Sequence, residues 1–161
     1  MTTNAHKFKE MFMLKVMEIE DTTLQSASVK MVEDMPDYFW TIPASSSGKY
    51  HPSCDLGDGG LVRHSIMVCQ CAIDLVISEM FVRDTPTNRD IARVASLFHD
   101  AWKNGVADDD GNFGDHTVHE HPKYASDFVR KHLEDAGVDP LKVDMIAGAV
   151  YTHMGKWCVS K

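Results

Sequence analysis

The sequence predicts an all-α fold, a bundle of helices around one hydrophobic core. Apolar residues recur at intervals of three and four along most of the chain, the spacing typical of the buried face of a helix. A capping residue or a proline opens most of these segments, and no segment shows the alternating pattern of a half-buried strand. At 161 residues, the chain fits a single domain.

The N-terminal part of the chain predicts two helices followed by a loop. His6–Glu20 carries spaced apolar residues among Lys and Glu, as in a short amphipathic helix. Asp21 or Thr22 can cap a second helix, which Pro36 closes. Residues 37–60 are rich in Pro, Ser and Gly and have no period, so we expect a long irregular loop, a type of segment that is often functional.

The rest of the chain predicts four further helices, which together form the core of the domain over residues 61–157. The N-terminal residues 1–36 are expected to join them in one domain. The predicted helices are, in order, Leu61–Phe81, one capped by Thr87 or Asn88 that runs through Phe98, one opened by Pro122 that ends near Gly137, and one opened by Pro140. A polar loop rich in Asp and Gly separates the second from the third.

The charge balance bears on possible partners. Sixteen Lys and Arg against 24 Asp and Glu give a net charge of −8, which offers no overall attraction to nucleic acid or anionic lipid. Charged residues interrupt the apolar stretches well short of the roughly 20 residues that a membrane span needs. The first residues are charged and lack the apolar centre of a secretory signal. We therefore expect a cytoplasmic protein with no membrane partner.

Histidine is the unusual residue of this sequence, with nine in the chain. Four local motifs contain histidines that stand at or near a predicted helix end or on an inward face. The motifs are Gly59–His64 (GGLVRH), Phe98–Lys103 (FHDAWK), His119–Pro122 (HEHP) and Thr152–Trp157 (THMGKW). They lie too far apart for a local zinc finger, but they suit a bundle in which each helix brings one ligand into the core.

The adjacent pair His99 and Asp100 is central to this interpretation. An imidazole and a carboxylate at the end of an apolar helix are costly to bury without a partner. A divalent cation provides that partner, because both groups are good ligands for zinc, manganese and iron. Asp100 has two carboxylate oxygens and can therefore bridge two ions.

In this order the four motifs resemble the signature of the HD-domain superfamily of metal-dependent phosphohydrolases, over roughly residues 50–157. The resemblance implies a helical bundle with a metal site in its core. It implies that His64, His99 and Asp100 hold a first divalent ion, and that Asp100, His121 and His153 hold a second. The candidate ions are manganese, iron, zinc and nickel.

The resemblance also implies hydrolysis of a phosphoester by a metal-activated water. Asp100 and Lys103 are then the catalytic candidates, and Arg63, Lys103 and His119 are candidates for binding the substrate. The small acidic domain favours a phosphorylated small molecule, a nucleotide or cyclic nucleotide. The run Ser45–Lys49 lacks the spacing of a phosphate-binding P-loop, which we therefore reject.

Three alternatives stay open at this point. The GGLxxH and HxGxW motifs also resemble those of 3′-to-5′ exonuclease-type HD phosphodiesterases, which would make single-stranded nucleic acid a partner. A few superfamily members are di-iron oxygenases with the same ligands. An inactive scaffold is the third alternative, and the oligomeric state is left open.

The motif set departs from the family at one position. The resemblance implies a closing aspartate ligand on a later helix, yet no aspartate follows Asp144. We expect either a sequence shortened before that helix or one that naturally lacks it, unless Asp144 or another carboxylate replaces the ligand. The first ion would then have few protein ligands, so partial metal occupancy and low hydrolytic activity are expected.

Overall fold

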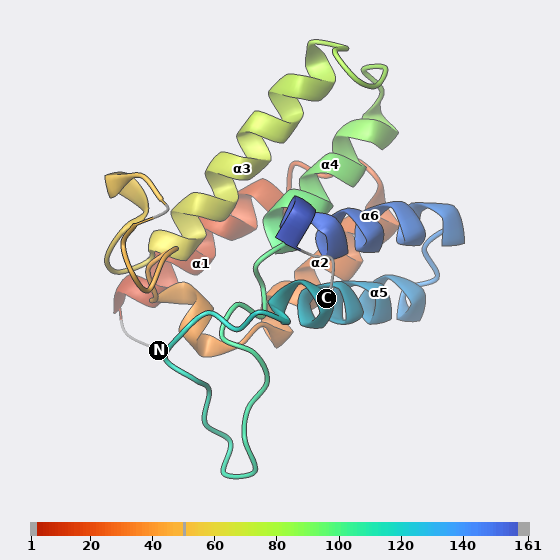
Figure 1. Ribbon diagram of the computed structural model, residues 1–161. Helices are drawn as coiled ribbons and strands as arrows, with labels where there is room; N and C mark the ends of the chain where they lie inside the picture. The colour runs from red at the N-terminus through yellow and green to blue at the C-terminus, as the bar shows by residue number, and fades with distance from the viewer. Residues whose placement is uncertain (1–2, 50, 158–161) are drawn as a thin grey trace.

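The computed structural model describes residues 3–49 and 51–157, and all regular elements in these two ranges are helical. The predicted all-α fold is therefore confirmed. The six α-helices are α1 (Thr3–Val16), α2 (Thr22–Asp34), α3 (Gly60–Ile77), α4 (Pro86–Phe98), α5 (His121–Asp135) and α6 (Pro140–Thr152) (Figure 1). Short 3-10 turns are η1 (Asp37–Trp40), η2 (Ser53–Asp55) and η3 (Gly155–Trp157).

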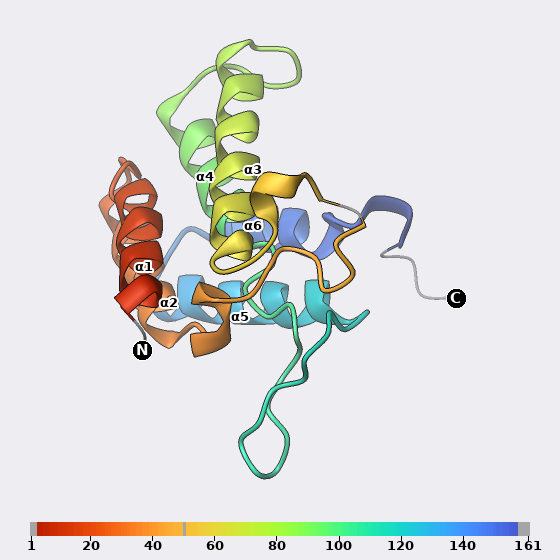
Figure 2. The ribbon, with the colours of Figure 1, turned by 90° about the vertical axis from the view of Figure 1, so that its left-hand side faces the viewer.

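The helices pack as successive pairs. α3 and α4 form one helical hairpin, α5 and α6 form a second, and α4 packs against α6 to join them (Figures 1 and 2). α1 and α2 pack on the side of these hairpins, with α1 against α3 and α2 against α5. The segment between α4 and α5 extends away from the bundle as a long loop (Figure 2).

Side-chain caps fix where several helices begin. Of the two capping candidates that the sequence offers for α2, Asp21 is the cap: it accepts hydrogen bonds from two backbone N–H groups in the first turn. The predicted start of α4 is wrong, because Thr85 caps this helix by accepting from the N–H of Asn88, and Pro86 occupies the first turn. A proline in the first helical turn leaves no helical hydrogen bond unmade.

A cluster of four aromatic rings links the N-terminal helices to the rest of the bundle. Phe12 of α1 makes edge-to-face contacts with Phe39, Trp40 and Phe98, at centroid distances of 5.5–5.6 Å. All four side chains are fully buried. Because Phe98 ends α4, this cluster also anchors the residues that directly follow it.

The segment between α2 and α3 is less irregular than predicted. It contains η1 and η2, and it folds back onto the first turn of α3. Three backbone hydrogen bonds hold it there, from Gly59 to Thr41, from Leu61 to Ile42 and from Ala44 to Asp55. This segment thus lies against the helix that carries the first histidine motif.

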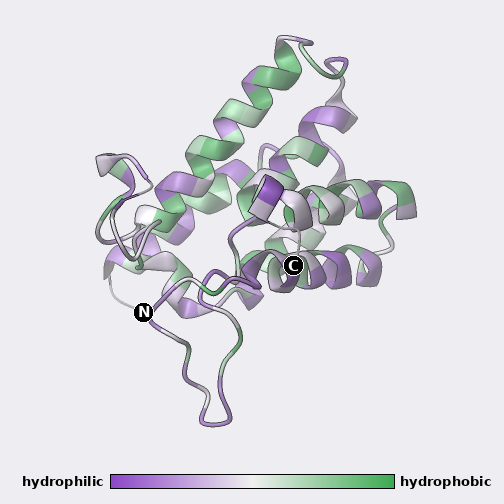
Figure 3. Ribbon diagram, viewed as in Figure 1, coloured by the Kyte–Doolittle hydropathy of each residue, from purple (hydrophilic) through white to green (hydrophobic). Residues whose placement is uncertain are grey.

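α3 is the most apolar helix among the described residues. By length and composition alone, Gly60–Ile77 could cross a membrane, although helices in the core of a soluble protein pass the same test. Here α3 packs on α1 and α4, and apart from Met67 its large exposed apolar residues lie toward its outer end, which continues into the α3–α4 turn. This end of the helix is coloured hydrophobic in Figure 3. The exposed apolar residues at this end are Leu75, Ile77, Met80, Phe81 and Val82.

Candidate metal centre

The four motif histidines and Asp100 come from different helices and meet in one place. His64 lies in the second turn of α3, His99 ends α4 and is followed by Asp100, His121 opens α5, and His153 ends α6. His99, Asp100 and His121 are buried, whereas His64 and His153 are partly exposed. The sequence-predicted ligands therefore share one pocket in the fold, and their role as ligands stays a prediction.

Asp100 is at the middle of the cluster, and each of its oxygens faces two imidazoles. Oδ2 lies 3.4 Å from Nε2 of His99 and 3.9 Å from Nε2 of His64. Oδ1 lies 3.2 Å from Nε2 of His121 and 3.5 Å from Nε2 of His153. These atoms form two groups of three that could each hold a metal ion, with Asp100 common to both and ligand atoms within 4.8 Å of one another.

The other ring nitrogens show which tautomer most of these histidines adopt. Nδ1 of His99, His121 and His153 each lies 2.7 Å from the carbonyl oxygen three residues earlier. A carbonyl can only accept, so in the neutral ring Nδ1 carries the proton and Nε2 carries the lone pair. All three rings therefore present a lone pair to Asp100.

This arrangement brings lone pairs together without a donor between them. Nε2 of His121 and Nε2 of His153 lie 3.2 Å apart. Oδ1 of Asp100 is buried and receives no hydrogen bond from the described residues. Buried acceptors are costly when no positive group meets them, and a divalent cation would satisfy the imidazoles and the carboxylate at once. The residues present therefore fit a divalent metal.

The charge states of the cluster agree with this fit. Burial and the neighbouring His99 lower the pKa of His64 to about 4, which keeps its ring neutral at pH 7. Burial alone would raise the pKa of Asp100, but His99 and Lys103 outweigh it and hold the pKa of this carboxyl well below its ordinary value. Neutral imidazole and ionised carboxylate are the forms that bind metals.

A cavity of about 590 Å³ opens beside the cluster. The candidate ligands form part of its wall, together with Lys103, whose Nζ lies 2.5 Å from Oδ2 of Asp100. The other lining residues are Ala44, Ser45, Ser46, Ser47, His51, Thr117, Met154 and Trp157. Sequence reasoning did not assign these residues to the site. Ala44, the three serines and His51 lie in a segment without periodicity, which gives no signal of where it folds, whereas Met154 and Trp157 stand in the last histidine motif.

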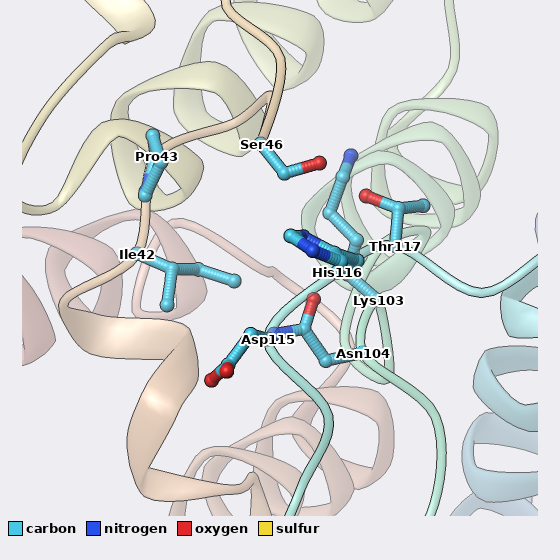
Figure 4. A pocket seen from close by; sticks show the side chains of 8 residues that line it. All are labelled: Ile42, Pro43, Ser46, Lys103, Asn104, Asp115, His116 and Thr117. Atoms are coloured by element: carbon cyan, nitrogen blue, oxygen red, sulfur yellow. The ribbon is translucent and has the colours of Figure 1, made fainter.

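A smaller cavity of about 190 Å³ adjoins the first one. The two share Ser46, Lys103 and Thr117, which lie toward the top of Figure 4. His116, whose position in the sequence indicates no clear role, lines this smaller cavity. Lys103 thus lies between the two spaces and contacts Asp100 at the same time.

Two predicted substrate-binding residues lie elsewhere. The Arg63 guanidinium donates to the backbone carbonyls of Cys54, Leu56 and Asp58 at 2.7–2.8 Å and does not line the cavity. His119 is exposed and is also absent from the lining. Among the predicted substrate-binding residues, only Lys103 faces the cavity.

Asp144, which the sequence offered as a replacement for the closing aspartate, is not part of the centre. Its side chain is exposed and pairs with Arg130 at 2.8 Å on the surface of the α5–α6 hairpin. A different carboxylate, Asp55, lies close to the centre: its Oδ2 is 3.4 Å from Nδ1 of His64, and the residue is 1% exposed.

Comparison with known families agrees with this geometry. The model of the HD domain family matches residues 61–159, more than half of the chain. The chain belongs to the HD domain family. HD domains bind divalent metals and are in general metal-dependent phosphohydrolases, and the histidine and aspartate cluster contains two groups of residues that could hold such a metal. No significant match to a curated protein or to a solved structure was found.

Proposed function

We propose that this HD domain is a phosphohydrolase that cleaves a phosphoester of a nucleotide or cyclic nucleotide. The observation that carries the proposal is the position of the cluster, in which one buried carboxylate faces four imidazoles on the wall of a cavity. The cavity volume of about 590 Å³ lies within the range of roughly 300–1,000 Å³ common for small-molecule sites.

The lining supplies the groups that phosphoester hydrolysis needs. Metal ions held by the cluster would supply a water of lowered pKa and would polarise the phosphoryl oxygens. Lys103 faces the cavity beside Asp100, where its ammonium can stabilise negative charge that develops on the non-bridging oxygens. The hydroxyls of Ser45, Ser46 and Ser47 offer hydrogen-bond donors to the same oxygens.

An aromatic residue on the lining favours a nucleotide over a simple phosphate. Trp157 lines the cavity and is 63% exposed, so its indole is accessible for stacking on a base. Lys156 lies beside it, with Nζ 4.9 Å from the ring centroid. The same pair favours the second candidate function, a 3′-to-5′ exonuclease, because aromatic rings with nearby cations bind single-stranded nucleic acid.

The test is a substrate panel assayed after loading with each candidate metal. The purified chain would be loaded with Mn²⁺, Fe²⁺, Zn²⁺ or Ni²⁺ and offered nucleoside monophosphates, cyclic nucleotides and single-stranded oligonucleotides. With at least one substrate we expect metal-dependent release of phosphate or opening of the cyclic phosphodiester. This activity should be lost in Asp100→Ala. Asp109→Ala, which removes an exposed carboxylate from the α4–α5 loop, serves as the control.

The outcomes separate the candidate functions. Stepwise release of mononucleotides from oligonucleotides would select the exonuclease. Turnover that needs iron and dioxygen would select the oxygenase instead. Absence of any metal-dependent turnover across the panel, or full activity in Asp100→Ala, would contradict the proposed phosphohydrolase.

A further inference from the structure

One histidine of the centre is oriented differently from the other three. Nδ1 of His99, His121 and His153 contacts a backbone carbonyl of its own chain segment. Nδ1 of His64 instead faces a carboxylate oxygen, Oδ2 of Asp55, at 3.4 Å. Asp55 belongs to η2, a segment outside the part of the chain that the HD family matches.

The fold holds the backbone of Asp55 tightly against α3. Its carbonyl accepts from the N–H of Ala44, and its N–H donates to the carbonyl of Pro52. A Cβ added at Gly60 would lie 2.0 Å from the Asp55 carbonyl oxygen, so only glycine permits this approach.

Arg63 explains how this segment stays aligned with the ligand next to it. Its guanidinium donates to the carbonyls of Cys54 and Leu56, the residues on either side of Asp55. Because Arg63 directly precedes His64 on α3, the same helix carries both the imidazole and the group that ties the facing segment in place. The position of Asp55 is therefore fixed by backbone contacts that do not depend on its side chain.

The buried carboxylate of Asp55 requires a hydrogen-bond donor, and the imidazole of His64 can provide one. The residue is 1% exposed, and a buried carboxylate without a donor is costly. The thiol of Cys54 lies 3.5 Å from Oδ1, a weak donor, which leaves Oδ2 to His64. A proton on Nδ1 of His64 satisfies Asp55 and leaves the Nε2 lone pair directed at Asp100.

We propose that Asp55 is a positioning residue for His64: it accepts a hydrogen bond from Nδ1–H of His64, fixes the ring orientation and directs Nε2 to the first ion. An imidazole whose N–H points at a carboxylate is a more basic ligand than one whose N–H points at a carbonyl. Asp55 thereby adds negative charge beside the ion that has few carboxylate ligands of its own. The proposal rests on the metal centre but not on the reaction catalysed there.

A rival arrangement uses the same residues. Ligand atoms of His51, Asp55 and His64 lie within 4.8 Å of one another and could themselves hold an ion. That ion would need the lone pair on Nδ1 of His64, whereas the positioning role needs the proton there. A neutral imidazole has only one free lone pair, so the two arrangements exclude each other and can be separated by experiment.

The first measurement is the tautomer of His64 in the metal-free chain. Long-range ¹H–¹⁵N NMR spectra of the imidazole rings, with the His64 signals assigned through His64→Gln, distinguish a proton on Nδ1 from one on Nε2. We expect the Nδ1–H form in the native chain and a mixed population in Asp55→Ala. An Nε2–H form in the native chain, or a tautomer unchanged in Asp55→Ala, would overturn the proposal.

The second measurement is metal affinity, read without any substrate by competition between Mn²⁺ and a chelator. Loss of a carboxylate that orients a ligating histidine typically costs 10–100-fold in affinity, and we expect this for the weaker-held ion in Asp55→Ala. Asp55→Asn keeps an acceptor oxygen and the side-chain shape, so it should lose less metal affinity than Asp55→Ala. It also provides a readout if the alanine variant does not fold.

Two further variants complete the design. Asp58→Asn removes an exposed carboxylate from the same segment and should leave affinity unchanged. His51→Ala should also leave it unchanged, and a loss as large as that of Asp55→Ala would show an ion bound by His51, Asp55 and His64, which overturns the positioning role. If the proposed function fails while these results hold, the chain has an oriented metal centre without phosphohydrolase activity.

Discussion

At the scale of single residues, Asp100 and Lys103 define the chemistry of the centre. Asp100 faces four imidazole nitrogens, and Lys103 is the cation that contacts it and is itself only 6% exposed. Asp100 is the only carboxylate among the described residues that line the cavity, so no other lining side chain can replace it as the shared ligand. Its loss and the loss of Lys103 should therefore have different effects.

Replacing Lys103 should impair turnover while leaving metal content unchanged. In Lys103→Met the apolar stem keeps its packing, but the charge that faces the cavity is gone. Loss of one group that stabilises developing charge typically lowers kcat by roughly 10²–10³-fold. Elemental analysis and steady-state kinetics on the same preparation check both parts.

The control for this variant is Lys123→Met, which removes an exposed lysine paired with Asp127 on the surface of α5. It should retain full kcat. A native kcat in Lys103→Met would show that Lys103 serves only to balance the charge of Asp100.

The residues of the centre were predictable to different degrees. The five candidate ligands could be found because each stands in a motif at or near a helix end. Arg63 and His119 were expected at the site because they neighbour ligands in sequence, yet successive residues on a helix point about 100° apart, and His119 lies in an exposed turn before α5. Asp55 could not be found, because its role depends on how an aperiodic segment folds onto α3.

At the scale of secondary structure, caps decide where the helices begin and also connect distant parts of the chain. Asp21 caps α2 and its second oxygen accepts from Nζ of Lys142 in α6 at 2.6 Å. The hydrogen bond from Lys142, helped by those from the backbone of the first turn, lowers the pKa of Asp21 below its ordinary value. One side chain thus stabilises a helix and a contact between two helices.

Asp21→Ala should lower the free energy of unfolding by about 1 kcal/mol, the typical cost of losing an N-cap. Because the folded-state pKa is lowered, the stabilisation is present above the unfolded-state pKa and is lost as the pH falls through the folded-state pKa. The difference in the free energy of unfolding between the native chain and Asp21→Ala, measured by urea denaturation, should be constant near neutral pH and decrease in strong acid.

Asp21→Asn separates the two contributions, since the amide oxygen can still cap the helix but carries no charge for Lys142. It should be intermediate in stability at neutral pH. If the difference in the free energy of unfolding between the native chain and Asp21→Ala grows in acid, the lowered pKa assigned to Asp21 is wrong.

The elements themselves were largely predictable, and the errors have physical causes. Proline in the first turn marked α5 and α6 correctly. The start of α4 was placed two or three residues late, because Thr85, Thr87 and Asn88 are all good capping residues and only the fold selects among them. α3 was predicted to extend to Phe81, since the apolar spacing continues into the exposed turn that follows Ile77.

At the scale of the whole molecule, the N-terminal helices belong to the same core as the metal centre. Phe12 of α1 contacts Phe98, the residue directly before His99. The HD family match begins only at residue 61, so this part of the core lies outside it. The stability of the centre should therefore depend on residues far from it in sequence.

Phe12→Ala should lower the free energy of unfolding of the chain by about 3–5 kcal/mol, the usual cost of removing a buried aromatic side chain. If α1 belongs to the single domain, unfolding followed by circular dichroism and by tryptophan fluorescence should give coincident transitions. Leu14→Ala, which truncates a side chain that is 69% exposed on the same helix, should change little.

Two separate transitions in the native chain, with only the first affected by Phe12→Ala, would show that the N-terminal helices fold independently. In that case the aromatic cluster would be an interface between two units.

Anomalous diffraction from crystals of the chain grown with saturating Mn²⁺ would locate the bound ions. We expect anomalous peaks at two positions, one among His64, His99 and Asp100 and one among Asp100, His121 and His153, whether or not the first is fully occupied. Ions bound only at other residues, or none at saturating metal, would contradict a metal centre shared through Asp100.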